Sequence, residues 1–311
     1  MPDPQSASSF RLEPFVLALI LGKTSMTIDD LESLSPAEKL AHCTVRIECE
    51  IPGGGLATGT GFYYTIDLGG GRSTPVIVTN KHVVRGTTAV RFLMTTQSED
   101  GRPLVGTTFS VTVPDGERHW IPHPDPSIDL CALPMAAALR QIGEQGARIF
   151  SVGFDKSALL QEAEIADMTG VERVLMVGYP NGLWDRANNL PVFRRGMLAT
   201  SYRYGWNGRR EFLIDAACFP GSSGSPVLQF ETGAYQSRRG LMFGGPRIKL
   251  LGVLYAGPQH SINGEVEIVE VPTRQGVFAA GIPNHLGIVI RADCLLDFEG
   301  ELRGRLASPG S

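Results

Sequence analysis

Residues 219–227, FPGSSGSPV, place a serine inside a tight glycine-rich turn that leads directly into an apolar strand. Gly221 and Gly224 lie on either side of Ser223, so the backbone is free to bend until its N–H groups converge on one point. A serine hydroxyl is a poor nucleophile until a base takes its proton, and a histidine suits that task near neutral pH. This turn therefore directs attention to histidines and carboxylates elsewhere in the chain.

Two upstream segments supply these groups. In residues 77–84, IVTNKHVV, a β-branched strand ends and His82 follows at once. In residues 126–133, PSIDLCAL, Asp129 opens an otherwise apolar strand. A carboxylate beside a histidine fixes the tautomer of the ring and stabilises the imidazolium that forms. The chain thus offers a base, an orienting carboxylate and a nucleophile in the order His82, Asp129 and Ser223.

The sequence around these segments predicts mostly β structure, because apolar residues alternate with period two between turn residues. Asn207-Gly208 lies between two strand-like runs, which is a strong hairpin signal. Two β modules, at about 40–135 and 170–285, fit this layout. We predict strands at 44–50, 61–66, 75–79, 89–94, 107–113, 130–133, 174–178, 197–206, 209–214, 250–255 and 277–280.

Composition excludes several classes of protein. Of the 311 residues 42% are hydrophobic, which argues against global disorder, and a net charge of −4 argues against a protein that coats nucleic acid. The longest apolar run, 15–22, is too short for a membrane helix, and no signal-peptide cleavage site follows it. The five cysteines include no CxxC pair and predict reduced, buried thiols. We therefore expect a cytoplasmic protein that binds neither nucleic acid nor a membrane.

The three segments together resemble the trypsin-like serine proteases, which have the chymotrypsin double β-barrel fold. Residues 215–226, DAACFPGSSGSP, are most similar to the bacterial high-temperature-requirement (HtrA/Deg) branch, and the resemblance covers about residues 40–300. It implies an all-β fold of two six-stranded barrels with a few short helices. The boundaries that we assign are an N-terminal extension with a short helix at 1–39, a first barrel at 40–135, a connector at 136–169 and a second barrel with a closing segment at 170–311.

The resemblance also implies a role for each matching residue. His82 is the general base, Asp129 orients it, and Ser223 attacks the substrate. The backbone N–H groups of Gly221 and Ser223 form the oxyanion hole. The position of the charge-selecting carboxylate in trypsin-type enzymes falls on Ala217, which has no charge, so we expect a small or apolar residue before the scissile bond. The implied substrate pocket consists of Ala217, Cys218, Tyr255, Ala256 and Gly257.

This sequence departs from the patterns of the family at three points. Ser222 stands where many members have an aspartate, so activation by an N-terminal ammonium ion is not expected. Ser225 replaces a common glycine and removes no catalytic group. About 84 residues follow Val227, and the second barrel needs most of them, so we expect no PDZ domain.

Other motifs have plainer interpretations. Residues 53–61, GGGLATGTG, lack the Gly-Lys-Ser/Thr of a phosphate-binding loop and are interpreted as a turn or rim loop. His119 and His123 are separated by a proline and are not expected to bind metal. Asp125, between two prolines, is interpreted as a turn residue, and the turn at 179–182 has no assigned role.

We therefore expect a bacterial serine endopeptidase that needs no metal or organic cofactor and acts on proteins or peptides. The alternative is a catalytically silent or latent trypsin-like module that binds proteins or is activated by an unknown partner. Interleaved arginines and aromatic residues at 194–210 suggest nucleic-acid binding, but alternation along a hairpin explains them more simply.

Overall fold

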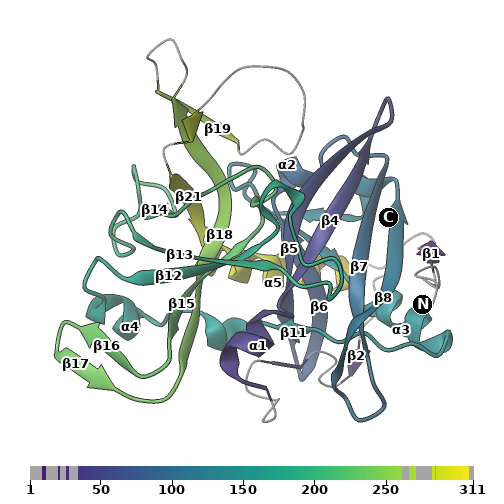
Figure 1. Ribbon diagram of the computed structural model, residues 1–311, viewed down its shortest axis with the longest axis horizontal. Coiled ribbons are helices and arrows are strands. Elements are labelled where there is room, and N and C mark those ends of the chain that lie inside the picture. The colour runs from purple at the N-terminus through teal and green to yellow at the C-terminus, as the bar shows by residue number, and fades with distance from the viewer. Residues whose placement is uncertain are drawn as a thin grey trace.

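The computed structural model describes residues 34–260, 266–270, 282–283 and 285–307, and the short segments 9–11, 20–21 and 26–27 (Figure 1). The strand predicted at 277–280 and most of the predicted 1–39 extension lie outside the described residues. Two β-sheets lie side by side, one formed by the first half of the chain and the other by the second half (Figure 1). The predicted all-β class with few short helices is confirmed.

The first sheet carries the His82 and Asp129 segments and has the strand order β1-β8-β7-β4-β5-β6-β10-β9, with β2 also paired to β6. Its neighbours on the path pair antiparallel except for β1 and β8, which are parallel. The strands are β1 (Ser9–Arg11), β2 (Ile20–Leu21), β4 (Thr44–Ile51), β5 (Gly55–Gly69), β6 (Arg72–Thr79), β7 (Ala89–Gln97), β8 (Pro103–Pro114), β9 (Ile121–Pro122) and β10 (Cys131–Pro134).

The second sheet closes on itself. Its order is β15-β12-β13-β14-β21-β18, and β18 pairs back with β15, so six strands form a closed barrel. Strands β19 and β20 pair with β18 outside the ring. The strands are β12 (Arg173–Gly178), β13 (Val192–Leu198), β14 (Glu211–Asp215), β15 (Pro226–Glu231), β18 (Arg247–His260), β19 (Val266–Glu270), β20 (Ile282–Pro283) and β21 (Leu286–Arg291).

Two small sheets complete the strands. Strands β3 (Met26–Thr27) and β11 (Val152–Gly153) pair in parallel, and β16 (Ala234–Ser237) and β17 (Gly240–Phe243) form an antiparallel hairpin between β15 and β18. The strands of the first sheet from β4 onward fall within the predicted 40–135 range and those of the ring within 170–311. The division into four segments stays a prediction.

The predicted Asn207-Gly208 hairpin is only partly confirmed. Asn207 and Gly208 have φ of 52° and 73°, as a two-residue turn with positive φ at both positions requires. The strand predicted at 197–206 is wrong, because β13 ends at Leu198 and only two residue pairs join it to β14. The chain leaves the sheet because Tyr202 turns into the barrel core, where its hydroxyl donates to the Leu251 carbonyl at 3.2 Å.

Three groups of buried apolar side chains form the core. One fills the first sheet around residues such as Val45 and Phe92, and one fills the closed barrel around Met176 and Phe212. The third joins the two halves and includes residues of β5, β10, β18 and β21. The two sheets are therefore packed against each other through a common apolar layer, which fixes the position of one relative to the other.

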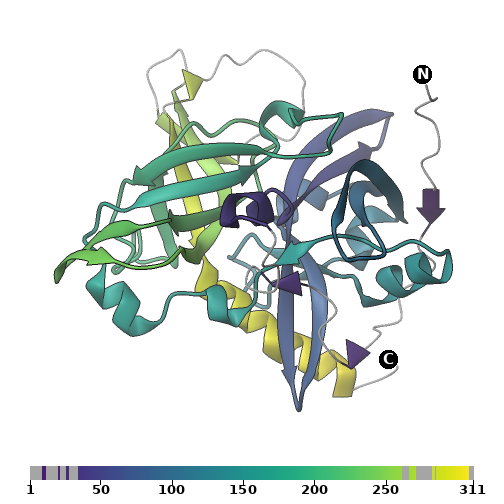
Figure 2. The ribbon, with the colours of Figure 1, turned by 60° about the horizontal axis from the view of Figure 1, so that its bottom comes forward.

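The helices are short and lie outside the sheets (Figure 2). Helix α1 begins with the predicted capping box, in which Ser35 and Glu38 each accept a hydrogen bond from the backbone of the other. The chain does not end in a single strand or helix at 286–298 but in β21, a 3₁₀ turn and α5. The helices are α1 (Pro36–Leu40), α2 (Lys81–Val84), α3 (Ala136–Glu144), α4 (Glu162–Asp167) and α5 (Asp297–Ala307), with 3₁₀ turns at Gly116–His119, Lys156–Ala158, Pro180–Gly182 and Ala292–Leu296.

Helix α5 returns from the closed barrel toward the first sheet along one side of the molecule (Figure 2). Its Arg303 donates to the Asp67 carbonyl of β5 at 3.2 Å, so the helix links the last strand of one half to a hairpin of the other. None of the helices described here is long and apolar enough to cross a membrane.

All five cysteines are buried free thiols, as predicted. Burial raises the pKa of Cys49, Cys218 and Cys294 to about 12, so these thiols stay protonated near neutral pH.

The buried His42 predicts how stability changes with pH. Its ring packs edge-on against Phe150, and burial lowers its pKa from the ordinary 6.5 to about 4. The unfolded chain therefore binds a proton on this ring at higher pH than the folded protein does. This stability is complete above about pH 6.5 and is lost as the pH falls toward 4, by about 3 kcal/mol in total.

We expect His42→Phe, which keeps a ring against Phe150, to show a shallower fall in the free energy of unfolding between pH 6.5 and 4 than the natural protein. Urea unfolding at a series of pH values measures this slope. His119→Phe is the control for loss of one imidazole elsewhere. Equal slopes for the natural protein and His42→Phe would contradict the assignment.

Candidate active site

The pairing of β6 with β10 brings His82 and Asp129 together. These strands run antiparallel with Thr79 opposite Cys131, so the residues just after β6 lie beside those just before β10. His82 stands in the single turn of α2, and its Nδ1 lies 2.5 Å from Oδ2 of Asp129. The backbone N–H of His82 donates to Oδ1 of the same carboxylate at 3.1 Å. Both oxygens of Asp129 are thus directed at His82.

Neighbouring side chains hold this pair in place. The Asn80 amide donates to the backbone carbonyl of Asp129 at 2.8 Å, and the Lys81 ammonium donates to the carbonyl of Pro126 at 2.9 Å. Because an ionised carboxylate only accepts hydrogen bonds, Nδ1 of His82 carries the proton. Nε2 is then the nitrogen with a lone pair, and it is buried.

The Ser223 turn is formed by two successive bends between β14 and β15. Ser222 N donates to Phe219 O and Ser225 N donates to Ser222 O, each at 3.0 Å. Gly221 and Gly224 adopt φ of +84° and +86°, a region that favours glycine. A Cβ at position 224 would lie 1.9 Å from the carbonyl oxygen of Thr60, so only glycine fits there.

Thr60 of β5 connects the Ser223 turn to the His82 segment. Its backbone N–H donates to the Ser223 carbonyl at 2.9 Å, and its own carbonyl accepts a hydrogen bond from the Thr79 hydroxyl at 2.7 Å. Thr79 is the last residue of β6, three positions before His82. The nucleophile turn of the second half is thereby attached to the strand that ends at the histidine. The structure thus brings the His82, Asp129 and Ser223 segments together at the junction of the two halves.

Backbone contacts also fix the two proposed oxyanion positions. The Pro220 carbonyl accepts from Asn181 N at 2.5 Å, and the Gly221 carbonyl accepts from the Thr60 hydroxyl at 2.9 Å. The turn at 179–182, which had no assigned role, therefore packs directly on the loop that carries Gly221. Gly59-Thr60-Gly61, considered in the sequence only as part of a phosphate loop, proves to contain a residue of the site.

The residues of the predicted pocket lie next to the Ser223 turn. Gly224 N donates to Leu254 O at 2.8 Å, and Leu254 N donates to Ser225 O at 3.0 Å, so β18 runs directly beside the turn. Tyr255, Ala256 and Gly257 follow on that strand.

Tyr255 is linked to a second buried acidic residue. Its hydroxyl donates to Oε1 of Glu211 at 3.0 Å, and burial raises the pKa of both groups. The nearby negative charge of Asp129 contributes to the rise in the pKa of Tyr255.

Ala217 and Cys218 approach β13 and β21. Arg194 of β13 donates from Nη1 to the Ala217 carbonyl at 3.0 Å, and its guanidinium carbon lies 4.7 Å from the centre of the Phe219 ring. The Cys218 sulfur would lie 2.6 Å from a Cβ at Gly287, so it fills the space beside that glycine. Alternation along 194–210 gave no sign of this contact, since it depends on residues distant in sequence.

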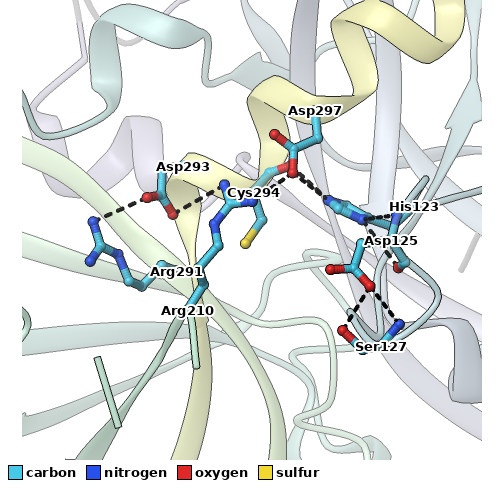
Figure 3. A network of polar contacts seen from close by, with 8 residues as sticks. All are labelled: His123, Asp125, Ser127, Arg210, Arg291, Asp293, Cys294 and Asp297. Carbon is cyan, nitrogen blue, oxygen red and sulfur yellow. Dashed lines mark hydrogen bonds and ion pairs between the residues drawn. The ribbon is translucent and has the colours of Figure 1, made fainter. Parts of the chain in front are cut away.

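Asp125 and His123 serve the loop before Asp129 (Figure 3). Oδ1 of Asp125 accepts from Ser127 N and Oγ at 2.9 and 2.7 Å, as expected of a turn residue. Nδ1 of His123 accepts from Asp125 N at 3.0 Å, so its Nε2 carries the proton and donates to Cys294 O at 3.0 Å. Both ring nitrogens of His123 are therefore bound to protein groups, which leaves neither for a metal ion.

The other side of this contact is a cluster of charges at the start of α5 (Figure 3). Asp297 lies 3.3 Å from Nε2 of His123 and accepts from Arg210 at 2.6 Å. Asp293 pairs with Arg210 and with Arg291 of β21. The end of the chain is thus bonded to the loop that presents Asp129.

Comparison with known proteins agrees with this arrangement. The family model of the trypsin-like peptidase domain matches residues 59–235, more than half of the chain. No curated protein matches the sequence in a direct search.

Solved structures with a similar course of the chain include other proteases. An HtrA-type protease, AlgW with a tripeptide, is 16% identical over 88% of this chain and 62% of its own, with a TM-score of 0.43. This chain therefore spans less than two thirds of the length of that protein. The active form of the Rv3671c protease from M. tuberculosis is 19% identical over 96% of this chain and 94% of its own, with a TM-score of 0.39.

An inactivated protease paralogue of the scabies mite is 16% identical over 86% of this chain and 97% of its own, with a TM-score of 0.44. These identities are low, and the assignment rests on the family model. The match contains the segments of His82, Asp129 and Ser223 and confirms the predicted resemblance. The chain belongs to the trypsin-like peptidase family.

Proposed function

We propose that this protein is a serine endopeptidase that uses His82, Asp129 and Ser223 as a catalytic triad. The observation that carries the proposal is the His82–Asp129 pair at 2.5 Å, attached through Thr79 and Thr60 to the turn that presents Ser223. The substrates are proteins or peptides.

The proposed reaction proceeds in two stages. Oγ of Ser223 forms a bond to the carbonyl carbon of the substrate while Nε2 of His82 takes the hydroxyl proton. The N–H groups of Gly221 and Ser223 stabilise the negative charge on the carbonyl oxygen. His82 then gives its proton to the departing amine as the peptide C–N bond breaks and the acyl-enzyme forms. Water releases the acyl group by the reverse proton transfers, with His82 again acting first as base.

The first specificity pocket is proposed to accept a small or apolar side chain. Ala217 offers no carboxylate for Arg or Lys, and the Arg194 guanidinium bound to its carbonyl is a cation that disfavours them. The buried Cys218 side chain occupies part of the space opposite Gly287. Its raised pKa makes it a lining residue rather than a second nucleophile.

The setting that we propose is the bacterial cytoplasm. Five buried free thiols fit a reducing compartment, and the bacterial origin follows from the resemblance to the HtrA branch. The alternative, a silent or partner-activated module on the same fold, is an outcome of the first experiment below.

A fluorophosphonate probe tests the nucleophile. We expect the natural protein to be labelled and Ser223→Ala to remain unlabelled, because the probe reacts with an activated serine. Ser222→Ala is the matched control, since the Ser222 hydroxyl is buried and makes no hydrogen bond within the described residues. A folded natural protein that takes up no label would favour the latent or silent module.

The orienting role of Asp129 has a separate test. Asp129→Asn keeps the size of the side chain but replaces an acceptor of the Nδ1 proton with an amide, which favours the wrong tautomer of His82. We expect kcat on a peptide substrate to fall by about 10⁴-fold. Asp125→Asn, on the same loop, is the control and should retain activity within a few fold. Comparable losses in both variants would assign the effect to the loop rather than to the triad.

Specificity is checked with a peptide library. We expect cleavage after small and apolar residues and little after Arg or Lys, for the reasons given for Ala217 and Arg194. Mass spectrometry of the products identifies the residue before each cleaved bond. Products dominated by Arg or Lys at that position would refute the proposed pocket.

A further inference from the structure

Thr60 makes hydrogen bonds to three segments of the site at once. It is fully buried in β5, and its backbone groups are taken up by Ser223 and Thr79 as described above. Its hydroxyl makes two further contacts. It donates to the Gly221 carbonyl at 2.9 Å and accepts from Tyr179 N at 3.1 Å. A threonine hydroxyl has one proton to donate, and here that proton is directed at Gly221.

The orientation of the Gly221 N–H depends on the two peptide groups beside it. None of the described peptide bonds is cis, and in a trans peptide the C=O and N–H point in opposite directions. The Pro220 carbonyl points at Asn181 N, so the Gly221 N–H of that same peptide points away from the 179–182 turn. The next carbonyl, that of Gly221, points at the Thr60 hydroxyl. Both peptides that flank the Gly221 Cα are therefore fixed.

The close packing of this loop leaves little room for another arrangement. A Cβ at Gly221 would lie 2.6 Å from Tyr179 O and 3.2 Å from Gly182 N. The turn at 179–182 is itself tied to Thr60 through Tyr179 N. One hydroxyl thus bonds to the Gly221 loop directly and to the turn that supports the loop from the other side.

We infer that Thr60 is a positioning residue for the oxyanion hole, whose hydroxyl holds the Gly221 N–H in the direction that a developing oxyanion requires. This inference rests on the proposed function. Ser222 provides no carboxylate to hold the loop, and its hydroxyl is buried without a hydrogen bond in the described part of the chain. The first half of the chain therefore supplies the bond that fixes the loop of the second half. Thr60 does not touch the reacting atoms and acts through Gly221.

Thr60→Val and Thr60→Ser separate the hydroxyl from the rest of the side chain. Valine has nearly the shape of threonine but lacks the hydroxyl, while serine keeps the hydroxyl and lacks the methyl group. Removing one oxyanion-hole donor outright costs about 10²- to 10³-fold in kcat, and a donor that is merely loosened retains part of its effect. We expect Thr60→Val to lower kcat on a peptide substrate about 10- to 100-fold with KM within about threefold. Thr60→Ser should restore kcat to within about threefold of the natural protein.

A peptide aldehyde provides a readout that a merely structural role would not move. It forms a tetrahedral adduct with an active serine, so its oxyanion occupies the same hole. We expect its affinity to fall in Thr60→Val by about the same factor as kcat, while the affinity of the corresponding product peptide stays nearly constant. Thermal unfolding is measured on each variant. If Thr60→Val does not fold, Thr60→Cys, which has a weak donor of similar size, replaces it with the same expectations.

The outcomes distinguish this inference from the proposed function. An active natural protein with Thr60→Val at or near natural kcat would overturn the role of Thr60 alone. Equal losses in Thr60→Val and Thr60→Ser would also overturn it, since the methyl group and not the hydroxyl would then matter. A folded natural protein that is neither labelled nor active would overturn the proposed function and this inference with it.

Discussion

The hydrogen bond from Thr60 N to Ser223 O joins a central strand of the first half to the glycine-rich turn of the second. Without it, the His82–Asp129 pair and the Ser223 turn would belong to two separately folded sheets. The apolar layer between the halves supplies most of the burial, but burial has no direction. This bond, with the Thr79 and Thr60 side-chain bonds around it, sets the register between β5 and the turn. Glycine at 224 is the geometric condition for the approach.

The loop of Asp129 is held from a different direction. His123 lies on that loop and is bound to Cys294 O and Asp297 at the start of α5 (Figure 3). Arg210 connects Asp297 to the segment before β14. The base and its orienting carboxylate are therefore supported by residues from the far end of the chain, although both stand in the first sheet. Each half of the molecule stabilises the part of the site that the other half carries.

Local patterns predicted the elements that carry the chemistry. A strand that ends at Thr79 and another that begins near Asp129 were evident from their apolar alternation, and the Ser223 turn from its glycines. The contacts of Thr60 were not predictable in this way, because its hydrogen-bond partner Gly221 is 161 residues distant. Nor did the spacing of 197–206 reveal that Tyr202 leaves the strand to enter the core. What a residue does through a distant partner leaves no trace in the period of its own segment.

The order of strands in the closed ring has a consequence for synthesis of the chain. β21 lies between β14 and β18 in the ring, yet it follows Ser223 by more than sixty residues. A chain on the ribosome that has emerged only as far as the glycine-rich turn has neither β18 nor β21, so its barrel is an open sheet with unpaired edges. The residues that bind His123 emerge later still. A growing polypeptide therefore exposes its serine before it has the structure to activate it, which protects the chains being made around it.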